Sequence, residues 1–183
     1  MNKKFENKNF LIGITGGIAI YKTCDLVRKI KNLNGNVICI MTESATKFIS
    51  PMLFEQLSQN KVFCNMFDER EYSPSHISLS DWADVVIVVP CSCNTLSKLA
   101  TGKTEDLLTS TIYAMNKNKK VILCPSMNTN MWNHSITQKN LKVLKEIGYK
   151  IMLPEKGTLL CGKEGVGKLP DVDNILKFIS SLI

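Results

Sequence analysis

An uninterrupted run of five β-branched residues, Val85 to Val89, is the sequence feature that most constrains the fold. Because no polar residue alternates with the apolar ones, both faces of this segment must be buried, as in a central strand of a parallel sheet. A proline lacks the N–H that a sheet ladder needs, so we expect the strand to end at Pro90. Ligands of open parallel sheets bind beyond the carboxyl ends of the central strands. The residues after Pro90 are therefore the first candidates for a functional site.

Strand-like and helix-like segments alternate along the rest of the chain, which is the pattern of β-α-β units in a parallel sheet. Between residues 156 and 168, the glycines at 157, 162, 165 and 167 predict a loop without regular structure. The further strands are expected at 9–15, 36–41, 62–63, 121–124 and 150–153, and the helices after 16–17 and at 42–48, 51–57, 96–100, 105–115, 131–147 and 172–182.

The length and composition predict one domain covering residues 1–183, since the chain has 44% hydrophobic and 21% charged residues. No apolar run approaches the roughly 20 residues that span a bilayer, and the N-terminus lacks the apolar core of a signal peptide. We therefore expect a cytoplasmic protein with no membrane partner. The formal charge of +7 comes from scattered lysines without a nucleic-acid module, so it favours a small anionic ligand over nucleic acid.

The seven cysteines are an odd number, and most of them lie within apolar patterns where a reduced thiol packs as a small hydrophobe. Cys91 and Cys93 resemble half of a metal site. No second cysteine pair has zinc-like spacing, however, and the two histidines are His76 and His134. We expect a reducing compartment and no bound metal.

Glycines between the first strand and the first helix allow the backbone to approach an anion at a helix N-terminus. The spacing Gly13-x-x-Gly16-Gly17 is not that of a dinucleotide site, and the second strand ends at Thr42 without an acidic ribose partner. The pattern favours a mononucleotide phosphate over a dinucleotide. A tight turn with no ligand is the alternative.

Polar side chains follow two neighbouring strands at the same expected edge. Ser92, Asn94 and Thr95 follow the central strand, and Asn128 with Met131 follows the next. Each of these polar residues could simply cap a helix, and Met131 could belong to the core.

Two further residues could carry chemistry, although each has an ordinary alternative. His76 is either a base or an exposed histidine in a polar loop. Cys161 is either a functional thiol or an incidental one, made accessible by the glycines around it.

Taken together, these motifs resemble the homo-oligomeric flavin-containing cysteine decarboxylases over nearly the whole chain, from about Asn9 to Pro170. The resemblance is specific because several separated motifs occur in order. They are Gly16-Gly17-Ile18-Ala19-x-Tyr21-Lys22, His76-Ile77-x-Leu79 with Trp82-Ala83-Asp84, Pro90-x-Ser92-x-Asn94-Thr95, Asp106-Leu107-Leu108-Thr109, Pro125-x-Met127-Asn128-x-x-Met131-Trp132 and Leu160-Cys161-Gly162-x-x-Gly165-x-Gly167.

The resemblance implies a flavodoxin-like, Rossmann-like α/β fold with three layers, in which helices cover both faces of a parallel sheet. It implies FMN as cofactor and a homotrimer or a dodecamer built of trimers, with the flavin near a subunit contact. The implied reaction belongs to coenzyme A biosynthesis. It is decarboxylation of 4'-phospho-N-pantothenoylcysteine to 4'-phosphopantetheine through thioaldehyde and enethiolate intermediates.

The resemblance also implies roles for single residues. His76 would be the catalytic base and Cys161 the proton donor of the last step. Asn128, Met131 and Lys168 would bind the substrate. The residues implied to hold FMN are Gly16, Gly17, Thr42 and Ser44 at the phosphate and Ser92, Asn94 and Thr95 at the flavin.

Three residues depart from the family pattern. Cys91 and Cys93 stand where the family usually has alanine, and Lys168 stands where it usually has arginine. Lysine keeps the charge but loses the planar fork that makes a bidentate contact. Two alternatives within the resemblance are an oxidative peptidyl-cysteine decarboxylase of lantibiotic maturation and a non-catalytic flavin-binding regulatory subunit. Cys161 argues against the first alternative, and the joint presence of His76, Asn128 and Cys161 argues against the second.

Overall fold

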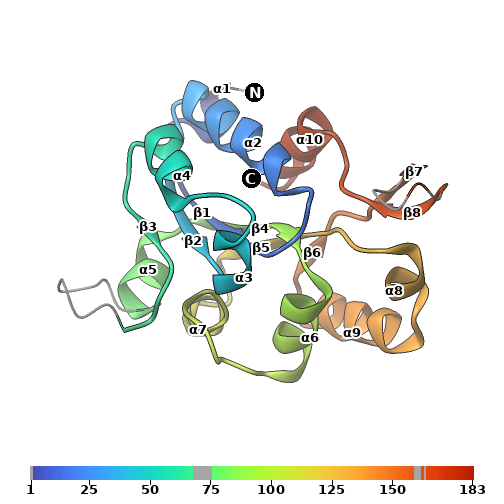
Figure 1. Ribbon diagram of the computed structural model, residues 1–183. Coiled ribbons are helices and arrows are strands. Elements are labelled where there is room, and N and C mark those ends of the chain that lie inside the picture. Colours follow the sequence, from blue (N-terminus) through green and yellow to red (C-terminus); the bar gives the residue numbers. More distant parts are fainter. Residues whose placement is uncertain (1, 68–75, 159–161, 163) are drawn as a thin grey trace.

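Six parallel strands form the central sheet of the computed structural model, which describes residues 2–67, 76–158, 162 and 164–183 (Figure 1). The strand order is β3-β2-β1-β4-β5-β6, so the chain first builds outward from β1 on one side and then returns to β4 on the other. This reversal makes the edge between β1 and β4 the switch point at which doubly wound sheets bind ligands. The bounds are β1 Asn9–Ile14, β2 Asn36–Met41, β3 Val62–Phe63, β4 Val85–Cys91, β5 Lys120–Pro125 and β6 Lys150–Ile151.

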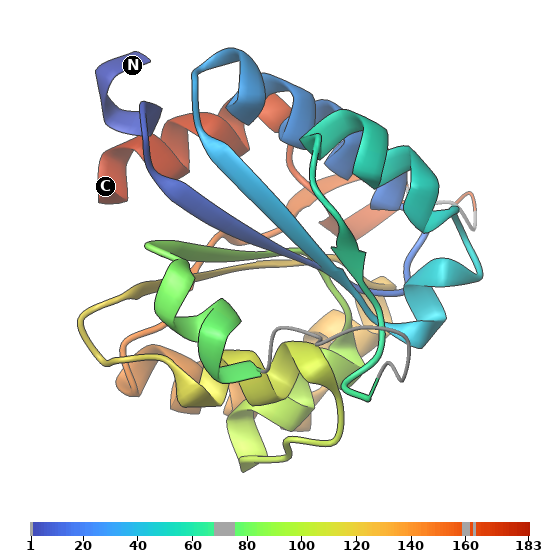
Figure 2. The same ribbon diagram turned by 90° about the vertical axis from the view of Figure 1, so that its left-hand side faces the viewer.

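Helices cover both faces of the sheet and complete the predicted three layers, as the two perpendicular views show (Figures 1 and 2). One face carries α1 Asn2–Phe5, α2 Ile20–Asn32, α4 Pro51–Ser58 and α10 Val172–Leu182. The other carries α5 His76–Trp82, α6 Cys93–Thr101, α7 Leu107–Ala114 and α9 Ser135–Glu146. Two short helices, α3 Glu43–Thr46 and α8 Thr129–Asn133, follow β2 and β5.

The central strand β4 is buried along its whole length, as the apolar run predicts. Alternate side chains enter the two cores: Ile87 and Val89 pack with α2 and α10, whereas Val86 and Val88 pack with α6 and α7. A continuous β-branched run is therefore required here, because each face of the strand contributes to a separate apolar core.

The expectation that the strand ends at Pro90 is wrong, because β4 continues to Cys91, which pairs with Pro125. The Val89–Pro90 peptide bond is cis, and the ladder between β4 and β5 is irregular between Val88 and Cys91. Side-chain hydroxyls replace the missing ladder bonds: Thr23 donates to the Val89 carbonyl at 2.9 Å. The proline is thus accommodated inside the strand.

The glycine-rich region is also not the irregular loop that its composition predicts. Strands β7 Glu155–Thr158 and β8 Glu164–Lys168 form an antiparallel pair in which Gly157 lies opposite Gly165. A Cβ on Gly167 would lie 2.1 Å from the Met127 carbonyl oxygen. The glycine at this position therefore permits close packing against the chain after β5.

Two regions of the chain differ from expectation in their helices. The single helix predicted at 131–147 is two helices, because the His134 side chain accepts a hydrogen bond from the Ile136 N–H at 3.3 Å and so caps a new start. His76 is not in a loop but is the first residue of α5.

Candidate functional site

Four turns meet at the carboxyl edge of the sheet, after β1, β2, β4 and β5 (Figure 1). Parallel strands bring these turns to one edge although they are far apart in the sequence. All of the polar residues predicted after strands lie in these turns. The edge is therefore the place where the candidate residues are brought together.

The turn after β1 presents backbone donors at the start of α2. In the described part of the chain, the N–H groups of Gly16, Gly17 and Ile18 have no hydrogen-bond acceptor. Such N–H groups, together with the positive end of the helix dipole, favour an anion. This turn therefore has the donor set of a phosphate site.

The turn after β2 packs directly on the turn after β1. A Cβ on Gly16 would lie 2.6 Å from Ser44 Cβ, so only glycine permits this approach. Thr42 caps α3 by accepting a hydrogen bond from the Ala45 N–H at 3.3 Å, and the exposed Ser44 side chain lies beside the unpaired donors. The residues present thus fit the phosphate end of a flavin mononucleotide.

Thr15 links the first turn to the central strand, a role that the sequence reasoning missed. Its buried hydroxyl donates to the Pro90 carbonyl at 2.7 Å and accepts from the Ser92 N–H at 2.8 Å. The Gly16-Gly17 motif begins one residue later, and no sequence pattern distinguishes a threonine at this strand end from any other threonine. Thr15 fixes the turns after β1 and β4 relative to each other.

The turn after β4 combines helix capping with one open polar group. Ser92 caps α6 by accepting from the Thr95 N–H at 3.3 Å, and its hydroxyl also pairs with Thr95 Oγ1 at 3.2 Å. Thr95 is buried, whereas Asn94 is exposed. The capping alternative therefore holds for Ser92, and Asn94 has the side chain most available to a ligand.

The turn after β5 leaves an amide donor free. Asn128 Oδ1 accepts from the Asn130 N–H at 2.8 Å, which fixes the orientation of the side chain. Its Nδ2 has no hydrogen-bond partner among the described residues. Because the amide N–H groups are left to donate, Asn128 is suited to a carboxylate or a carbonyl oxygen.

Strand β8 is hydrogen-bonded to the same turn. The Gly167 carbonyl accepts from the Met127 N–H at 3.1 Å and from Ser126 Oγ at 3.3 Å. Lys168 follows directly and is half-buried beside Gly157. The hairpin therefore delivers a cation to the side of the Asn128 turn.

Lys22 fixes the chain that follows Lys168. Its ammonium donates to the Leu169 carbonyl at 3.1 Å and to Asp171 Oδ1 at 2.7 Å. The hydrogen bond from Lys22 lowers the pKa of the Asp171 carboxyl, and the charges of Lys22 and Lys168 lower it further. The lysine of the first motif is thus a structural clamp between α2 and the end of β8.

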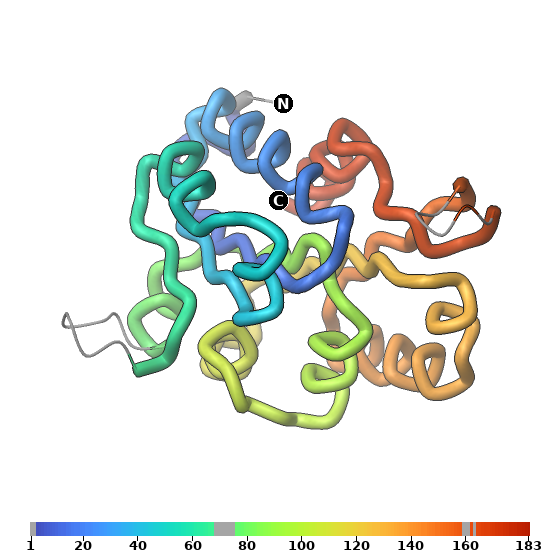
Figure 3. Tube along the Cα trace, viewed as in Figure 1, coloured from blue at the N-terminus to red at the C-terminus, as the bar shows by residue number. Residues whose placement is uncertain are grey.

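His76 is not near the Asn128 turn within one chain. Helix α5, which begins at His76, lies at the left of Figure 1, whereas α8 lies at the far right, and the tube view shows the same separation (Figure 3). The structure therefore brings together the predicted phosphate, flavin and Asn128 positions but not the predicted base. Cys161 lies outside the described residues.

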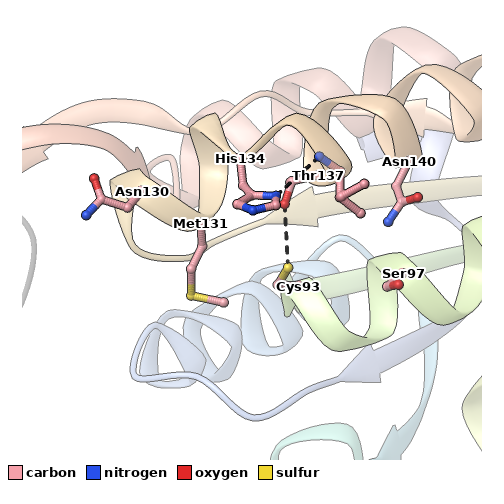
Figure 4. A pocket seen from close by; sticks show the side chains of 8 residues that line it. Cys93, Ser97, Asn130, Met131, His134, Thr137 and Asn140 are labelled. Atoms are coloured by element: carbon pink, nitrogen blue, oxygen red, sulfur yellow. Dashed lines mark hydrogen bonds between the residues drawn. The ribbon is translucent and has the colours of Figure 1, made fainter.

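A pocket of about 390 Å³ opens between α6 and the α8–α9 segment (Figure 4). Met131, which is 46% exposed, forms part of its wall, so the pocket adjoins the Asn128 turn. Sequence reasoning did not identify this pocket, because its wall combines two segments some forty residues apart. The lining residues are Cys93, Ser97, Asn130, Met131, His134, Ile136, Thr137 and Asn140.

The thiols near the site differ in their surroundings. Burial raises the pKa of Cys91, and it raises the pKa of Cys124 to about 12, so neither thiol ionises near neutral pH. Cys93 is only half-buried, and its sulfur lies 3.7 Å from Thr137 Oγ1.

Within the described ranges, no three His, Cys, Asp or Glu residues gather in a way that could hold a metal ion. No helix in those ranges is long and apolar enough to span a membrane.

The doubly wound parallel sheet, with a glycine turn and a helix N-terminus at its switch point, defines a flavodoxin-like α/β protein. The chain belongs to the Flavoprotein family, whose family model matches residues 1–183. It is 37% identical over 173 residues to a probable phosphopantothenoylcysteine decarboxylase of Streptococcus mutans, covering 94% of this chain and 97% of that protein.

It is 42% identical over 173 residues to the coenzyme A biosynthesis bifunctional protein CoaBC of Bacillus subtilis. That match covers 94% of this chain but 42% of the relative, so the chain spans less than half the length of this bifunctional protein.

Solved structures share the fold over nearly the full length. A cysteine-to-serine mutant of PPC decarboxylase, complexed with pantothenoylaminoethenethiol, matches with a TM-score of 0.85 and 28% identity, covering 97% of this chain and 98% of that one. The FMN-binding protein AtHal3 matches with a TM-score of 0.82 and 30% identity, covering 97% of each chain.

Proposed function

We propose that this protein is an FMN-dependent decarboxylase that converts 4'-phospho-N-pantothenoylcysteine to 4'-phosphopantetheine in coenzyme A biosynthesis. The carboxyl edge of the sheet carries this proposal. There, a turn whose three N–H groups have no acceptor among the described residues is joined through Thr15 to the Ser92 turn. The next turn presents an Asn128 amide nitrogen that also lacks a partner in the described part of the chain. A phosphate-binding end and a carboxylate-binding end on one edge are what a mononucleotide flavoenzyme acting on a carboxylate requires.

The relatives support the same reaction. The Streptococcus mutans protein has nearly the same extent as this chain and is named a phosphopantothenoylcysteine decarboxylase. The PPC decarboxylase mutant lacks a cysteine and is complexed with an enethiol. If a cysteine thiol supplies the last proton, a variant without that thiol is expected to accumulate the enethiol.

FMN is the flavin that the donor set favours. The turn after β1 suits a phosphate, and Thr42 stands where a dinucleotide site needs an acidic ribose partner. AtHal3 is named an FMN-binding protein. The phosphate would be held by Gly16, Gly17, Thr42 and Ser44, and the ring system by Ser92, Asn94 and Thr95.

The chemistry explains the need for a redox cofactor in a reaction without net oxidation. When bound, the flavin accepts a hydride from the carbon bearing sulfur and later returns it. The resulting thioaldehyde is the electron sink that lets the β-carboxylate leave as carbon dioxide. His76 takes the thiol proton at the start, a general-base role that an imidazole can perform.

Other residues of the chain hold the substrate and complete the proton balance. Asn128 donates its free amide hydrogens to the carboxylate, with Met131 beside it. Lys168 attracts the substrate, which carries a phosphate and a carboxylate, as a point charge. After decarboxylation, Cys161 gives the proton that joins the returned hydride on the enethiolate.

The separation of α5 from α8 supports a site shared between copies of the chain. Because α5 and α8 lie on opposite sides of one copy, a site that uses both residues would combine His76 of one copy with Asn128 of another (Figures 1 and 3). Exposed apolar side chains near the first turn, Ile18, Tyr21, Phe48 and Met52, are 50–66% exposed and would be covered by such a contact. We propose a homotrimer or a dodecamer of trimers in the cytoplasm, where the cysteines stay reduced.

The test begins with the absorbance spectrum of the pure protein and the mass of the released cofactor. FMN and the saturated product 4'-phosphopantetheine are expected after incubation with the cysteinyl substrate. Stoichiometric NAD or FAD, or no flavin binding after reconstitution, would contradict the cofactor assignment. Release of an enethiol as the final product would contradict the reaction and favour the oxidative branch of the family.

A further inference from the structure

The pocket between α6 and the α8–α9 segment has a mixed wall that the proposed reaction does not use (Figure 4). Met131 and Ile136 are 46% and 55% exposed and supply apolar surface. No lysine, arginine, aspartate or glutamate lines the pocket. The wall therefore does not suit a phosphate, and it favours a neutral ligand with apolar substituents.

Asn140 is a polar group in the pocket wall that could orient a bound ligand. Its side chain lies in the pocket wall and faces α6, and the residue is only 9% exposed (Figure 4). In the described part of the chain the carboxamide has no hydrogen-bond partner. Among the described residues, the buried side-chain oxygen without a partner is Thr129 Oγ1, so the Asn140 amide atoms are open to solvent in the pocket. A ligand that reaches them replaces water with direct hydrogen bonds.

The neighbours of Asn140 do not satisfy it. Thr137 pairs instead with the Cys93 sulfur at 3.7 Å, and the His134 Nδ1 accepts from the Ile136 N–H. A carboxamide offers one acceptor and two donors, which match the N–H and C=O of a secondary amide. The complementary ligand is thus a neutral amide chain with apolar branches.

We propose that this pocket binds the amide-linked acyl chain of the substrate, which makes Asn140 a specificity-determining residue. The proposal rests on the proposed function, because a pantothenoyl chain carries both amides and a dimethyl group. Met131 lies on the wall of the pocket, and Asn128 caps the N-terminus of the same short helix α8. The chain can therefore extend into the pocket while the cysteinyl carboxylate stays at Asn128.

Binding is tested without turnover by using Cys93 as a reporter. The flavin-loaded protein is alkylated with iodoacetamide, and the modified peptides are quantified by mass spectrometry. The probe is a neutral pantothenoyl amide that lacks both thiol and phosphate. It should slow alkylation of Cys93 and leave the rate at Cys24, the half-buried cysteine of α2, unchanged.

Asn140→Leu has nearly the shape of asparagine and removes the hydrogen bonds. It should weaken protection of Cys93 about tenfold, the size expected for lost hydrogen bonds to a neutral ligand. It should also raise the KM for the substrate by a similar factor at matched flavin content, with kcat changed less than about twofold. Asn133→Leu, the same change on α8 outside the pocket, should alter neither quantity.

Three results would overturn the proposal: no protection of Cys93 at saturating probe, equal protection in Asn140→Leu and wild type, or Cys93 that reacts only after oligomers are dissociated. The last would mean that a second copy covers the pocket. Failure of the proposed function is distinguishable, because it would appear as absent flavin or absent product while the amide still protects Cys93. A protein that makes product but shows no protection would sink the pocket assignment alone.

Discussion

Gly165 of β8 packs against Thr129 of α8 so closely that a Cβ on the glycine would lie 2.1 Å from Thr129 Oγ1. This oxygen is buried and has no hydrogen-bond partner among the described residues. The hairpin is therefore held on the Asn128 turn by close packing as well as by the hydrogen bonds to the Gly167 carbonyl. The same contact places Lys168 at the side of the proposed substrate site.

Gly165→Ala should consequently lower the free energy of unfolding by about 1–3 kcal/mol, the usual cost of overpacking. Denaturant unfolding would measure the loss. Adding Thr129→Ala should recover part of it, because the clashing oxygen and methyl group are removed.

Gly157→Ala is the matched control in the same hairpin. A Cβ there would meet Lys168 Cδ at 3.0 Å, and a flexible side chain can move away at little cost. Equal destabilisation by Gly157→Ala and Gly165→Ala would contradict the proposed docking contact.

His76→Asn should slow flavin reduction by substrate at least about 100-fold, the usual contribution of a general base. Flavin content should remain near normal, because His76 is proposed to act on the substrate. Anaerobic mixing with the cysteinyl substrate, followed by flavin absorbance, would measure the first step. The exposed Asp81→Asn on the same helix is the control. Flavin bleaching at the wild-type rate in His76→Asn would remove this histidine from the mechanism.

Oligomers that contain two different variants would test whether the site is shared between copies. If His76 of one copy serves Asn128 of another, mixing His76→Asn with Asn128→Leu protomers should restore activity that neither variant has alone. Mixed oligomers are prepared by co-expression, and the product is measured. Activity no higher than that of the separate variants would argue for a site within one chain.

Acid should weaken the protein partly through Asp106, which caps α7 and accepts hydrogen bonds from the Thr109 N–H at 2.8 Å and Lys98 at 2.9 Å. Burial by itself would raise the pKa of this carboxyl, but the hydrogen bonds from Thr109 and Lys98 outweigh it and the pKa is lowered. The stabilisation is therefore complete above the unfolded value of about 3.9 and is lost as the pH falls through the folded pKa.

Asp106→Asn should lower the free energy of unfolding at pH 7 by about 1 kcal/mol, since asparagine keeps the cap but loses the charge. The difference from wild type should shrink between about pH 4 and the acid limit. Urea unfolding at several pH values measures this, with Asp81→Asn as the control. A difference that is constant down to the lowest pH would contradict the assignment.

The fold could be predicted where one interaction dominates a segment. The run of β-branched residues before Pro90 fixes a central strand because both faces need apolar partners. The turn at Gly16 and Gly17 could likewise be placed, since glycines between a strand and a helix have few other uses. These local signals predict the α/β fold and the carboxyl edge of the sheet, and the structure confirms the fold.

Other features depend on contacts between distant segments and leave no local pattern. The glycines of β8 predict a loop from sequence alone, because their packing against Thr129 and Met127 is visible only in the structure. Thr15 could not be distinguished from any buried threonine before its bond to the Pro90 carbonyl was known. The separation of α5 and α8 is a property of the strand order, so the motifs alone do not show that His76 and Asn128 lie apart within one chain.

Cys161 provides the sharpest test, because it separates a decarboxylase that returns its hydride from one that does not. If this thiol protonates the enethiolate, Cys161→Ser should still oxidise and decarboxylate the substrate and should then stall. A serine hydroxyl has a pKa far above the thiol value of about 8.5, so it is a poor proton donor. Reduced flavin and a product two hydrogens lighter than 4'-phosphopantetheine should accumulate, whereas the control Cys24→Ser should release the saturated thiol. Mass spectrometry of the product decides, and unimpaired formation of 4'-phosphopantetheine by Cys161→Ser would defeat the assigned role.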